Sequence, residues 1–428
     1  MVSLKNFKKH SFLVYGLGST GKSVINFFKR NDIKNFKVWD DEFKNLYKSK
    51  HVVKLEETLD EVDHIVLSPG VSLNKSKNKD KLRKYKNKII TDIDLIYLFK
   101  KFFRSIVVTG TNGKSTTCKI LSHVLKDYKY KPLLGGNIGT PVLNLKIKKQ
   151  SLIIIEASSF QLEHSKFICP DYALLLNITN DHLDWHGSMK NYINSKFKIF
   201  KLQKQNQYSL INEKFKSHFI KQNYSGQLIT PEINKYQKFK FKIDNAYLRS
   251  SINDENMSYI LTLIKLLKIK EKIFLKLLST FKGLPHRYEV FLKKKNYVFI
   301  NDSKATSFQA TKFALRNTKD IFWIVGGLPK KNDILNLSKL SKNIVKCYII
   351  GKNIDFFKRQ IKNKLKFEVT HNLKNSIIHI LKDIKKFNRK KNNILLSPAS
   401  ASFDQFSNFE IRGEKFKKLS RLYARKYI

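Results

Sequence analysis

The chain has 428 residues, of which 42% are hydrophobic and 12% aromatic. This length predicts two or three domains, and this composition excludes a chain that is disordered throughout. Apolar runs of 18 or more residues do not occur, so we expect no membrane-spanning helix. The net charge of +50 would suit a nucleic-acid or membrane-surface protein, but the lysines are spread along the whole chain. We therefore expect no nucleic-acid partner and no membrane partner.

The cysteines and the first residues indicate the compartment. Cys118, Cys169 and Cys347 are scattered, which predicts a reducing environment without disulfides or a cysteine metal cluster. Residues 1–10 are basic, but the short apolar stretch after them runs straight into Gly16-Leu17-Gly18. This pattern is typical of a first strand and a glycine turn, and not of a signal peptide. We expect a cytoplasmic protein that works as a monomer.

Apolar runs of strand length recur along the chain, and polar or glycine-containing loops follow many of them. Segments with helical spacing lie between many of these runs, including 115–125 and 372–387. Strands that alternate with helices form parallel α/β sheets, which bind ligands at the carboxyl ends of their strands. The predicted strands are residues 12–15, 65–67, 106–108, 152–155, 173–176, 297–300, 322–325 and 394–396.

The motifs divide the chain into three predicted α/β domains. Residues 1–94 carry the glycine turn and are expected to be Rossmann-like. Residues 95–285 open with a phosphate loop and are expected to be of the P-loop ATPase type. Residues 286–428 are expected to form a second Rossmann-like domain. Residues 201–247 are rich in Lys, Gln and Asn and show little pattern.

The strongest local signal is the segment Thr109-Gly110-Thr111-Asn112-Gly113-Lys114-Ser115-Thr116, where a predicted strand enters a glycine loop and a helix begins. Backbone N–H groups and the helix N-terminus bind phosphates at such a loop. Lys114 would neutralise the β- and γ-phosphates, and the Ser115 hydroxyl would bind Mg²⁺. The loop is shorter than the usual phosphate loop, because Val108 stands where an earlier glycine is standard. The alternative is a chance match in a glycine turn.

Further polar segments follow other predicted strands. Glu156 ends one strand, where a second magnesium ligand belongs, although exposed glutamates at strand ends are common. Residues 177–186 contain two acids and two histidines, and a polar loop with a solvated histidine is an equal alternative. Residues 301–307, 326–333 and 397–406 carry cationic, hydroxyl and small side chains that could form an anion-binding wall.

Together these segments resemble the Mur ligase superfamily along essentially the whole chain. The resemblance is closest to the ligases that add D-glutamate to UDP-N-acetylmuramoyl-L-alanine, through residues 135–139, 301–306 and 397–409 and the pair Arg412-Gly413. It implies an ATP-dependent enzyme of peptidoglycan synthesis that works through an acyl phosphate. The implied substrates are ATP, D-glutamate and UDP-N-acetylmuramoyl-L-alanine, and the implied metals are two Mg²⁺ ions.

The resemblance also implies catalytic and metal-binding roles. Ser115 and Glu156 would share one magnesium, and His182 would bind the second. Lys196 stands where the family carries a carbamylated lysine, although on residue type alone it is one lysine among many. The expected catalytic side chains are Lys114, Glu156, His182 and Lys196.

The remaining implied contacts are with the three substrates. For the nucleotide they are Gly110, Thr111, Asn112, Gly113, Thr116, Asn253, Asn256, Arg287 and Asp302. For the UDP-sugar they are Ser19, Thr20, Ser68 and Asn137. For D-glutamate they are Thr306, Lys330, Ser402 and Phe409, and further substrate contacts are expected from Ser158 and Lys304.

The sequence departs from the family pattern at three places. Asp41 and Glu42 stand where the family offers a hydroxyl and an arginine to the uridine nucleotide. Ile252 replaces a histidine, and Leu328-Pro329 makes a third-domain loop less glycine-rich.

Three other functions stay open at this stage. A different ligase of the superfamily, such as a folylpolyglutamate synthase, is the nearest, and residues 397–409 argue against it. A nucleic-acid-stimulated ATPase would need basic and aromatic groups concentrated on one face. A ligase-like binding protein would not need the intact Lys114, Glu156, His182 and Lys196.

Overall fold

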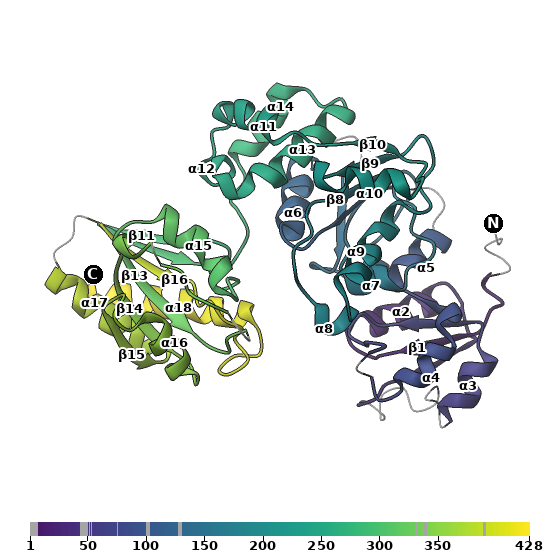
Figure 1. The fold of residues 1–428 in the computed structure, drawn as a ribbon, viewed down its shortest axis with the longest axis horizontal. Coiled ribbons are helices and arrows are strands. Elements are labelled where there is room, and N and C mark those ends of the chain that lie inside the picture. Colours follow the sequence, from purple (N-terminus) through teal and green to yellow (C-terminus); the bar gives the residue numbers. More distant parts are fainter. Residues whose placement is uncertain are drawn as a thin grey trace. The chain divides into compact units, whose positions relative to one another are not determined.

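The structure is a computed structural model that describes residues 7–42, 50, 52, 54–74, 76–99, 103–126, 131–330, 333–337, 340–387 and 391–428. The chain forms two compact units, Met1–Phe281 and Lys282–Ile428, and both consist of mainly parallel sheets and helices (Figure 1). Among the described residues, no helix combines the length and the apolar character needed to cross a membrane.

The first sheet has four parallel strands in the order β2-β1-β3-β4. Strand β1 is buried along its whole length, with Phe12 and Val14 in one core cluster and Leu13 and Tyr15 in another. This alternation arises because successive side chains of a strand point to opposite faces of the sheet. The elements are β1 (Phe12–Tyr15), α2 (Ser19–Arg30), β2 (Phe36–Trp39), α3 (Leu55–Glu61), β3 (His64–Leu67), α4 (Lys79–Lys84), β4 (Ile89–Ile90) and α5 (Asp92–Phe99).

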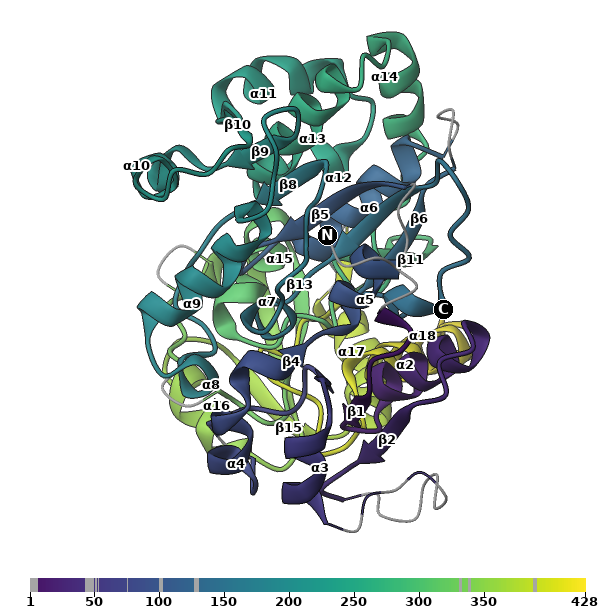
Figure 2. The ribbon, with the colours of Figure 1, turned by 90° about the vertical axis from the view of Figure 1, so that its right-hand side faces the viewer.

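The second sheet has six parallel strands in the order β10-β9-β8-β5-β7-β6. Strands β6 and β7 lie on one side of β5 and β8 to β10 on the other, so β5 ends at a topological switch point. The first elements of this part of the chain are β5 (Arg104–Thr109) and α6 (Lys114–Val124), which lie on either side of the phosphate loop. Figure 2 shows α6 beside β5. They are followed by β6 (Leu133–Gly136), β7 (Leu152–Glu156), α7 (Ser159–Glu163), β8 (Tyr172–Leu175), α8 (Leu183–His186) and α9 (Met189–Phe197).

The rest of the first unit completes this sheet and adds a group of helices. These elements are β9 (Tyr208–Ile211), α10 (Lys216–Lys221), β10 (Gln227–Ile229), α11 (Ile233–Phe239), α12 (Ala246–Arg249), α13 (Asp254–Leu266) and α14 (Glu271–Ser279). One cluster of buried apolar residues runs from the first sheet into the second, through Phe27, Ile93, Val142 and Ile155. The two sheets therefore share a continuous core, which explains why they form one compact unit.

The second unit contains the third sheet, with strand order β11-β12-β16-β13-β14-β15. All neighbouring strands are parallel except the edge pair β11 and β12. Trp323 faces one core cluster, and Phe322 and Ile324 face the other. The elements are β11 (Glu289–Lys294), β12 (Tyr297–Asn301), α15 (Phe308–Asn317), β13 (Ile321–Gly326), β14 (Ile344–Ile350), α16 (Ile354–Ile361), β15 (Phe367–His371), α17 (Leu373–Phe387), β16 (Asn392–Leu396) and α18 (Phe409–Tyr427).

The α/β fold class is confirmed, and each predicted strand and both predicted helices are present. The poorly patterned residues 201–247 contain β9, β10 and two helices, which the sequence did not predict. The division into three domains at residues 94 and 285 stays a prediction.

Candidate active site

The predicted phosphate loop lies between the carboxyl end of β5 and the first residue of α6. Gly113 has a φ of +83° and lies so close to Asn256 that an added Cβ would be 2.1 Å from the Asn256 Oδ1. The loop is held from the β8 side by Asn177, whose carbonyl accepts from the Thr111 N–H and whose Oδ1 accepts from the Asn112 N–H, both at 2.8 Å. The loop conformation therefore depends on glycine at position 113 and on contacts from distant segments.

Two lysines meet at one carbonyl of this loop. Lys114 Nζ donates to the carbonyl oxygens of Gly110 and Thr111, both at 2.8 Å. Lys196 Nζ, on α9, donates to the same Gly110 oxygen at 2.9 Å. The fold thus brings a lysine 82 positions further along the chain to the phosphate loop (positions 114 and 196).

Lys196 is only 1% exposed and is one of the largest fully buried side chains. Its Nζ lies 4.6 Å from the centroid of the Tyr192 ring, and the Tyr192 hydroxyl forms a 2.9 Å hydrogen bond with the Thr111 hydroxyl. Burial, reinforced by the nearby charge of Lys114, lowers the pKa of the Lys196 amine to about 6. A lysine in this environment is a neutral amine at physiological pH and therefore a nucleophile.

Glu156 ends β7 next to the phosphate loop, where β7 pairs with β5. One carboxylate oxygen accepts from the Asn137 side-chain amide at 3.0 Å. The other oxygen, Oε2, is buried and has no hydrogen-bond partner in the described part of the chain. A buried carboxylate oxygen without a donor is costly, and a cation would satisfy it, so the site fits the implied magnesium. Ser115, at the start of α6, is also buried.

His182 lies in the loop after β8 and has a φ of +52°. Its ring is 4.7 Å from the Phe160 ring and 6.4 Å from the Tyr192 ring, and its Nε2 is 3.5 Å from an Asp181 carboxylate oxygen. Phe160 follows the Glu156 segment and Tyr192 precedes Lys196, so His182 belongs to the same corner. Within the described residues, no three His, Cys, Asp or Glu side chains are grouped as a metal site.

Several predicted contact residues already have structural partners. The Asn253 amide donates to the Tyr247 carbonyl at 2.8 Å. Ser158 caps α7 in a reciprocal capping box with Gln161. The Ser68 hydroxyl donates to the Gly16 carbonyl at 2.8 Å. Ser68 and Ser158 follow strands β3 and β7, whereas Asn253 lies directly before helix α13, and each side chain helps to hold a local turn or loop.

Ser19 and Thr20 open helix α2, which follows the glycine turn after β1. The N-cap residue is Gly18, which has no side chain to cap the helix. A helix N-terminus that follows the carboxyl end of a strand in a Rossmann-like sheet is a common place for a phosphate to bind.

Of the two acidic residues after β2, Asp41 and Glu42, Asp41 has a clear structural role. Its Oδ1 accepts from the Tyr15 hydroxyl at 2.8 Å, from the Trp39 Nε1 at 3.0 Å and from the Asn78 amide at 2.9 Å. Its Oδ2 accepts from the Ser76 hydroxyl at 3.2 Å. Asp41 thus joins the ends of β1 and β2 to the loop after β3, and its charge is compensated by these donors.

In the second unit, Asp302 lies at the carboxyl end of β12 and is almost fully buried. It accepts from the Ser397 hydroxyl at 2.7 Å and from the Tyr288 N–H at 3.1 Å. Burial raises the pKa of the Asp302 carboxyl to about 7, and Arg287 opposes this rise. The charge of Arg287 therefore acts on Asp302, and the role of both residues in nucleotide binding stays a prediction.

The predicted amino-acid contacts lie on neighbouring loops of the same sheet. Lys304 Nζ is 4.1 Å from the centroid of the Phe409 ring. The loops of Lys330 and Ser402 are joined by a backbone pair in which Leu328 and Ala401 exchange two 2.9 Å hydrogen bonds. Ser402 is buried and Lys330 is exposed. Thr306 lies in the turn before α15.

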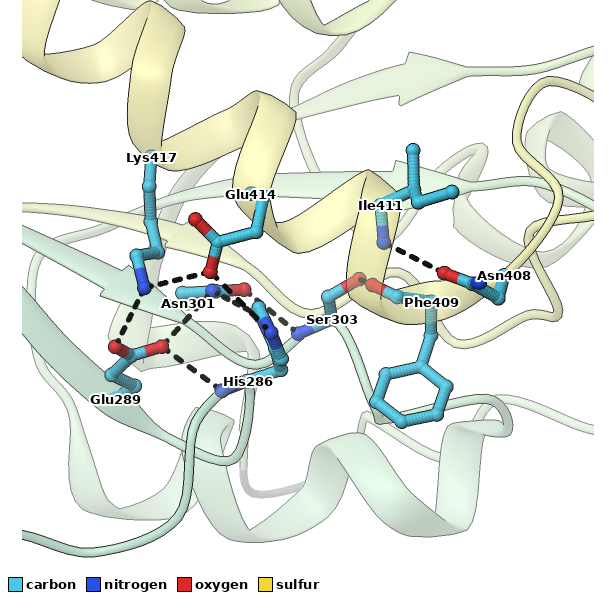
Figure 3. A network of polar contacts seen from close by, with 9 residues as sticks. All are labelled: His286, Glu289, Asn301, Ser303, Asn408, Phe409, Ile411, Glu414 and Lys417. Carbon is cyan, nitrogen blue, oxygen red and sulfur yellow. Dashed lines mark hydrogen bonds and ion pairs between the residues drawn. The ribbon is translucent and has the colours of Figure 1, made fainter. Parts of the chain in front are cut away.

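A polar network surrounds the first turns of α18 (Figure 3). Asn301 donates its amide to Glu289 at 3.2 Å and contacts the His286 ring nitrogen at 2.9 Å. Lys417 forms ion pairs with Glu289 and Glu414 at 3.0 and 2.9 Å. This network holds the segment around His286 against β11, β12 and α18.

Two further side chains, one in each unit, were not among the predicted site residues. Tyr192 could have been found from its position four residues before Lys196, because such residues share one face of a helix. Arg412 had a sequence signal only as part of the Arg412-Gly413 pair, and its contacts could not be predicted, because its partners come from loops more than 10 and more than 100 positions away.

The parallel sheet, the glycine loop and the lysine at the start of α6 define a phosphate-loop nucleotide-binding protein. Sequence comparison refines this class. Residues 108–283 match the Mur ligase middle domain, and residues 10–89 match the Mur ligase MurD-like N-terminal domain.

Relatives match over nearly the full length. The UDP-N-acetylmuramoylalanine–D-glutamate ligase of Rickettsia felis is 34% identical, with 98% of this chain and 99% of the relative covered. The same ligase of Francisella tularensis is 34% identical, with 95% of each covered.

Solved structures share the fold. The MurF ligase of Thermotoga maritima in complex with ADP has a TM-score of 0.57 at 17% identity, with 100% and 98% coverage of this chain and of that chain. The UDP-N-acetylmuramate–alanine ligase of T. maritima has a TM-score of 0.58 at 16% identity, with 97% and 100% coverage. The chain belongs to the Mur ligase family, in the group of UDP-N-acetylmuramoylalanine–D-glutamate ligases.

Proposed function

We propose that this chain joins D-glutamate to UDP-N-acetylmuramoyl-L-alanine in an ATP-dependent step of peptidoglycan precursor synthesis. Relatives of 30–34% identity over nearly the whole chain carry the name of this activity. The observation that supports it best is the meeting of Lys114 and the buried Lys196 at the Gly110 carbonyl, because it joins the phosphate loop to a second reactive amine.

The chemistry proceeds in two steps. The alanine carboxylate attacks the γ-phosphorus of ATP, so that an O–P bond forms, the β,γ-bridging bond breaks and ADP leaves. The D-glutamate amine then attacks the acyl phosphate, an amide bond forms, the amine loses a proton and phosphate leaves. Lys114 stabilises the negative charge that develops on the transferred phosphoryl group. Positioning of three substrates contributes as well, because ideally placed groups gain up to about 7–11 kcal/mol.

Magnesium would be held at two sites. Ser115 and Glu156 would hold the first ion, and the buried, unpaired Oε2 of Glu156 supports this assignment. His182 and Lys196 would hold the second. When bound, the ions neutralise the phosphate oxygens.

Lys196 can serve as a metal ligand only if it becomes anionic. Its neutral amine would attack CO₂, so that an N–C bond forms and a proton leaves, which produces a carbamate. Its burial and its lowered pKa supply the neutral amine that this step requires. Magnesium prefers oxygen ligands, which the carbamate offers and an ammonium does not.

The remaining residues are assigned to the three substrates. Thr111, Asn256, Arg287 and Asp302 would contact ATP. The N-terminus of α2 with Ser19 and Thr20, together with Ser68 and Asn137, would bind the UDP-sugar. Thr306, Lys330, Ser402 and Phe409 would bind D-glutamate, and Lys304 would approach the phosphates. We also propose that the protein acts as a cytoplasmic monomer with three domains divided at residues 94 and 285.

A coupled assay of phosphate release tests the function. The purified chain is given ATP, Mg²⁺ and UDP-N-acetylmuramoyl-L-alanine, with D-glutamate, L-glutamate, L-lysine or diaminopimelate as the amine. We expect release with D-glutamate only. Release with another amino acid would assign a different ligase activity, and hydrolysis stimulated only by nucleic acid would reject the ligase.

A further inference from the structure

Arg412 is the most deeply buried arginine among the described residues and is only 1% exposed. It lies in the first turn of α18, and its guanidinium points inward to the loops at the carboxyl ends of β12 and β16. Nε donates to the Ser303 hydroxyl at 3.0 Å. Nη2 donates to the carbonyl oxygens of Ser303 and Ser400 at 2.8 and 2.9 Å. One side chain thus joins three segments of the second unit.

These segments carry predicted substrate contacts, among them the amino-acid contacts Ser402 and Phe409. Ser303 immediately precedes Lys304, and its hydroxyl donates to the Phe409 carbonyl at 2.8 Å (Figure 3). Ser400 lies two residues before Ser402. The Ala401 backbone pairs with Leu328, two residues before Lys330, and therefore extends the connection to a fourth segment.

The charge of Arg412 has no paired carboxylate. Within the described residues, no Asp or Glu oxygen lies at ion-pair distance from its guanidinium, and Asp404 favours its charge only from further away. Nη1 makes no hydrogen bond to a described residue and lies near Gly327, where an added Cβ would be 3.3 Å from it. A buried guanidinium without a carboxylate costs stability. A role in stability alone therefore does not account for it.

We propose, on the basis of the proposed function, that Arg412 is a positioning residue that sets the amino-acid pocket. Its planar fork holds the loop of Ser402, the segment of Phe409 through Ser303, and the loop of Lys330 through the Leu328–Ala401 pair, in the arrangement that binds a dicarboxylic amino acid. A lysine could supply the charge but not three hydrogen bonds in one plane.

The nucleotide contact in the same unit has separate support. Asp302 is held by the Ser397 hydroxyl, the Tyr288 N–H and its own N–H, which donates to the Leu396 carbonyl at 2.8 Å. None of these bonds involves Arg412. The loss of Arg412 should therefore disturb amino-acid binding more than ATP binding.

The test compares Michaelis constants in the phosphate-release assay. Arg412→Lys should raise the KM for D-glutamate at least about tenfold, because small displacements of binding groups have large effects. The KM for ATP should stay within about twofold of the wild-type value. Arg412→Met should have a larger effect in the same direction. Equal changes in both constants, or an unchanged KM for D-glutamate, overturn the proposal.

Two substitutions on the same helix serve as controls. Arg421→Met removes an exposed arginine that lies over the Phe291 ring, and should change neither constant. Lys417→Met breaks the ion pairs with Glu289 and Glu414, and should lower the melting temperature without a selective change in the KM for D-glutamate. A selective change caused by Lys417→Met would show that any loosening of α18 has this effect, and would overturn a specific role of Arg412.

If the Arg412 variants do not fold, Ser303→Ala tests the proposed role of Arg412. It removes the hydroxyl that accepts from Arg412 and donates to Phe409, so the KM for D-glutamate should rise selectively. An unchanged KM would then overturn the proposal. If the wild-type chain uses another amino acid, the proposed substrate is wrong. In that case the KM for that amino acid, compared with the KM for ATP, still tests the role of Arg412. Phosphate release with no amino acid overturns both proposals.

Discussion

Replacement of Lys196 separates its chemical role from its structural role. We expect Lys196→Ala to lose at least about two orders of magnitude in turnover, the scale of one lost electrostatic group in an active site. Short-chain carboxylates such as formate or acetate should restore part of the activity, because they supply the oxygens that the carbamate would offer. Lys190→Ala, which removes an exposed lysine from the same helix, is the matched control and should keep wild-type turnover.

The lowered pKa of Lys196 determines how much of its amine is neutral and can react with CO₂. A lysine with the ordinary pKa of 10.5 is about 0.1% neutral at about pH 7.5, whereas one with a pKa of about 6 is roughly 97% neutral. Burial therefore raises the reactive fraction about a thousandfold. Carbamylation at neutral pH depends on this difference, because only the neutral amine attacks CO₂.

The same pKa predicts a change in stability. Between about pH 6 and 10.5 the unfolded lysine binds a proton that the buried amine does not, so stability rises with pH in this range. At pH 7 the buried amine costs up to about 5 kcal/mol, at about 1.4 kcal/mol for each pH unit below its ordinary pKa. Lys196→Met should therefore be more stable than the wild type at pH 7 in CO₂-depleted buffer, although it is inactive. The difference should shrink as the pH approaches 10.5.

Turnover measured in CO₂-depleted and in bicarbonate buffer tests the carbamylation of Lys196. Urea denaturation in the same buffers tests its effect on stability. The wild type should gain activity with bicarbonate, and Lys196→Ala should not. Wild-type activity of Lys196→Ala without CO₂ would refute the carbamate. A Lys196→Met variant that is less stable than the wild type at every pH would show that the amine is not neutral in the folded chain.

Three further predictions concern the phosphate loop, the amino-acid pocket and the Asp41 network. Lys114→Ala should fold normally but lose at least about a hundredfold in turnover, and near-normal turnover would remove the phosphate-loop assignment. Lys330→Ala should raise the KM for D-glutamate more than that for ATP, and a change in the ATP constant alone would move Lys330 to the nucleotide site. Asp41→Ala should cost about 1–3 kcal/mol in urea denaturation because its donors lose their acceptor, whereas Glu42→Ala, at an exposed position, should change stability by less than about 0.5 kcal/mol.

The sequence alone predicted the features that depend on local pattern. The strand before Gly110 and the helix after Lys114 were predictable because apolar runs, glycines and helix starts are read from neighbouring residues. The family resemblance followed from motifs at the strand ends, and the comparisons confirm it. Residues 201–247 were not predictable, because their strands β9 and β10 are short and carry few alternating apolar residues, and β10 lies at the edge of the sheet.

Only the tertiary structure decided how these segments meet. The sequence does not tell that Lys196 is buried against Gly110, because its burial comes from packing between α9 and the phosphate loop. From the sequence, Asp41 departs from the expected ligand-binding pattern, whereas the fold surrounds it with donors from strand β1 and from the loop after β3. Arg412 likewise has partners that are distant in the chain. Desolvation and hydrogen bonding depend on every neighbour in space, so the chemical state of a side chain is determined by the fold and not by its position in a motif.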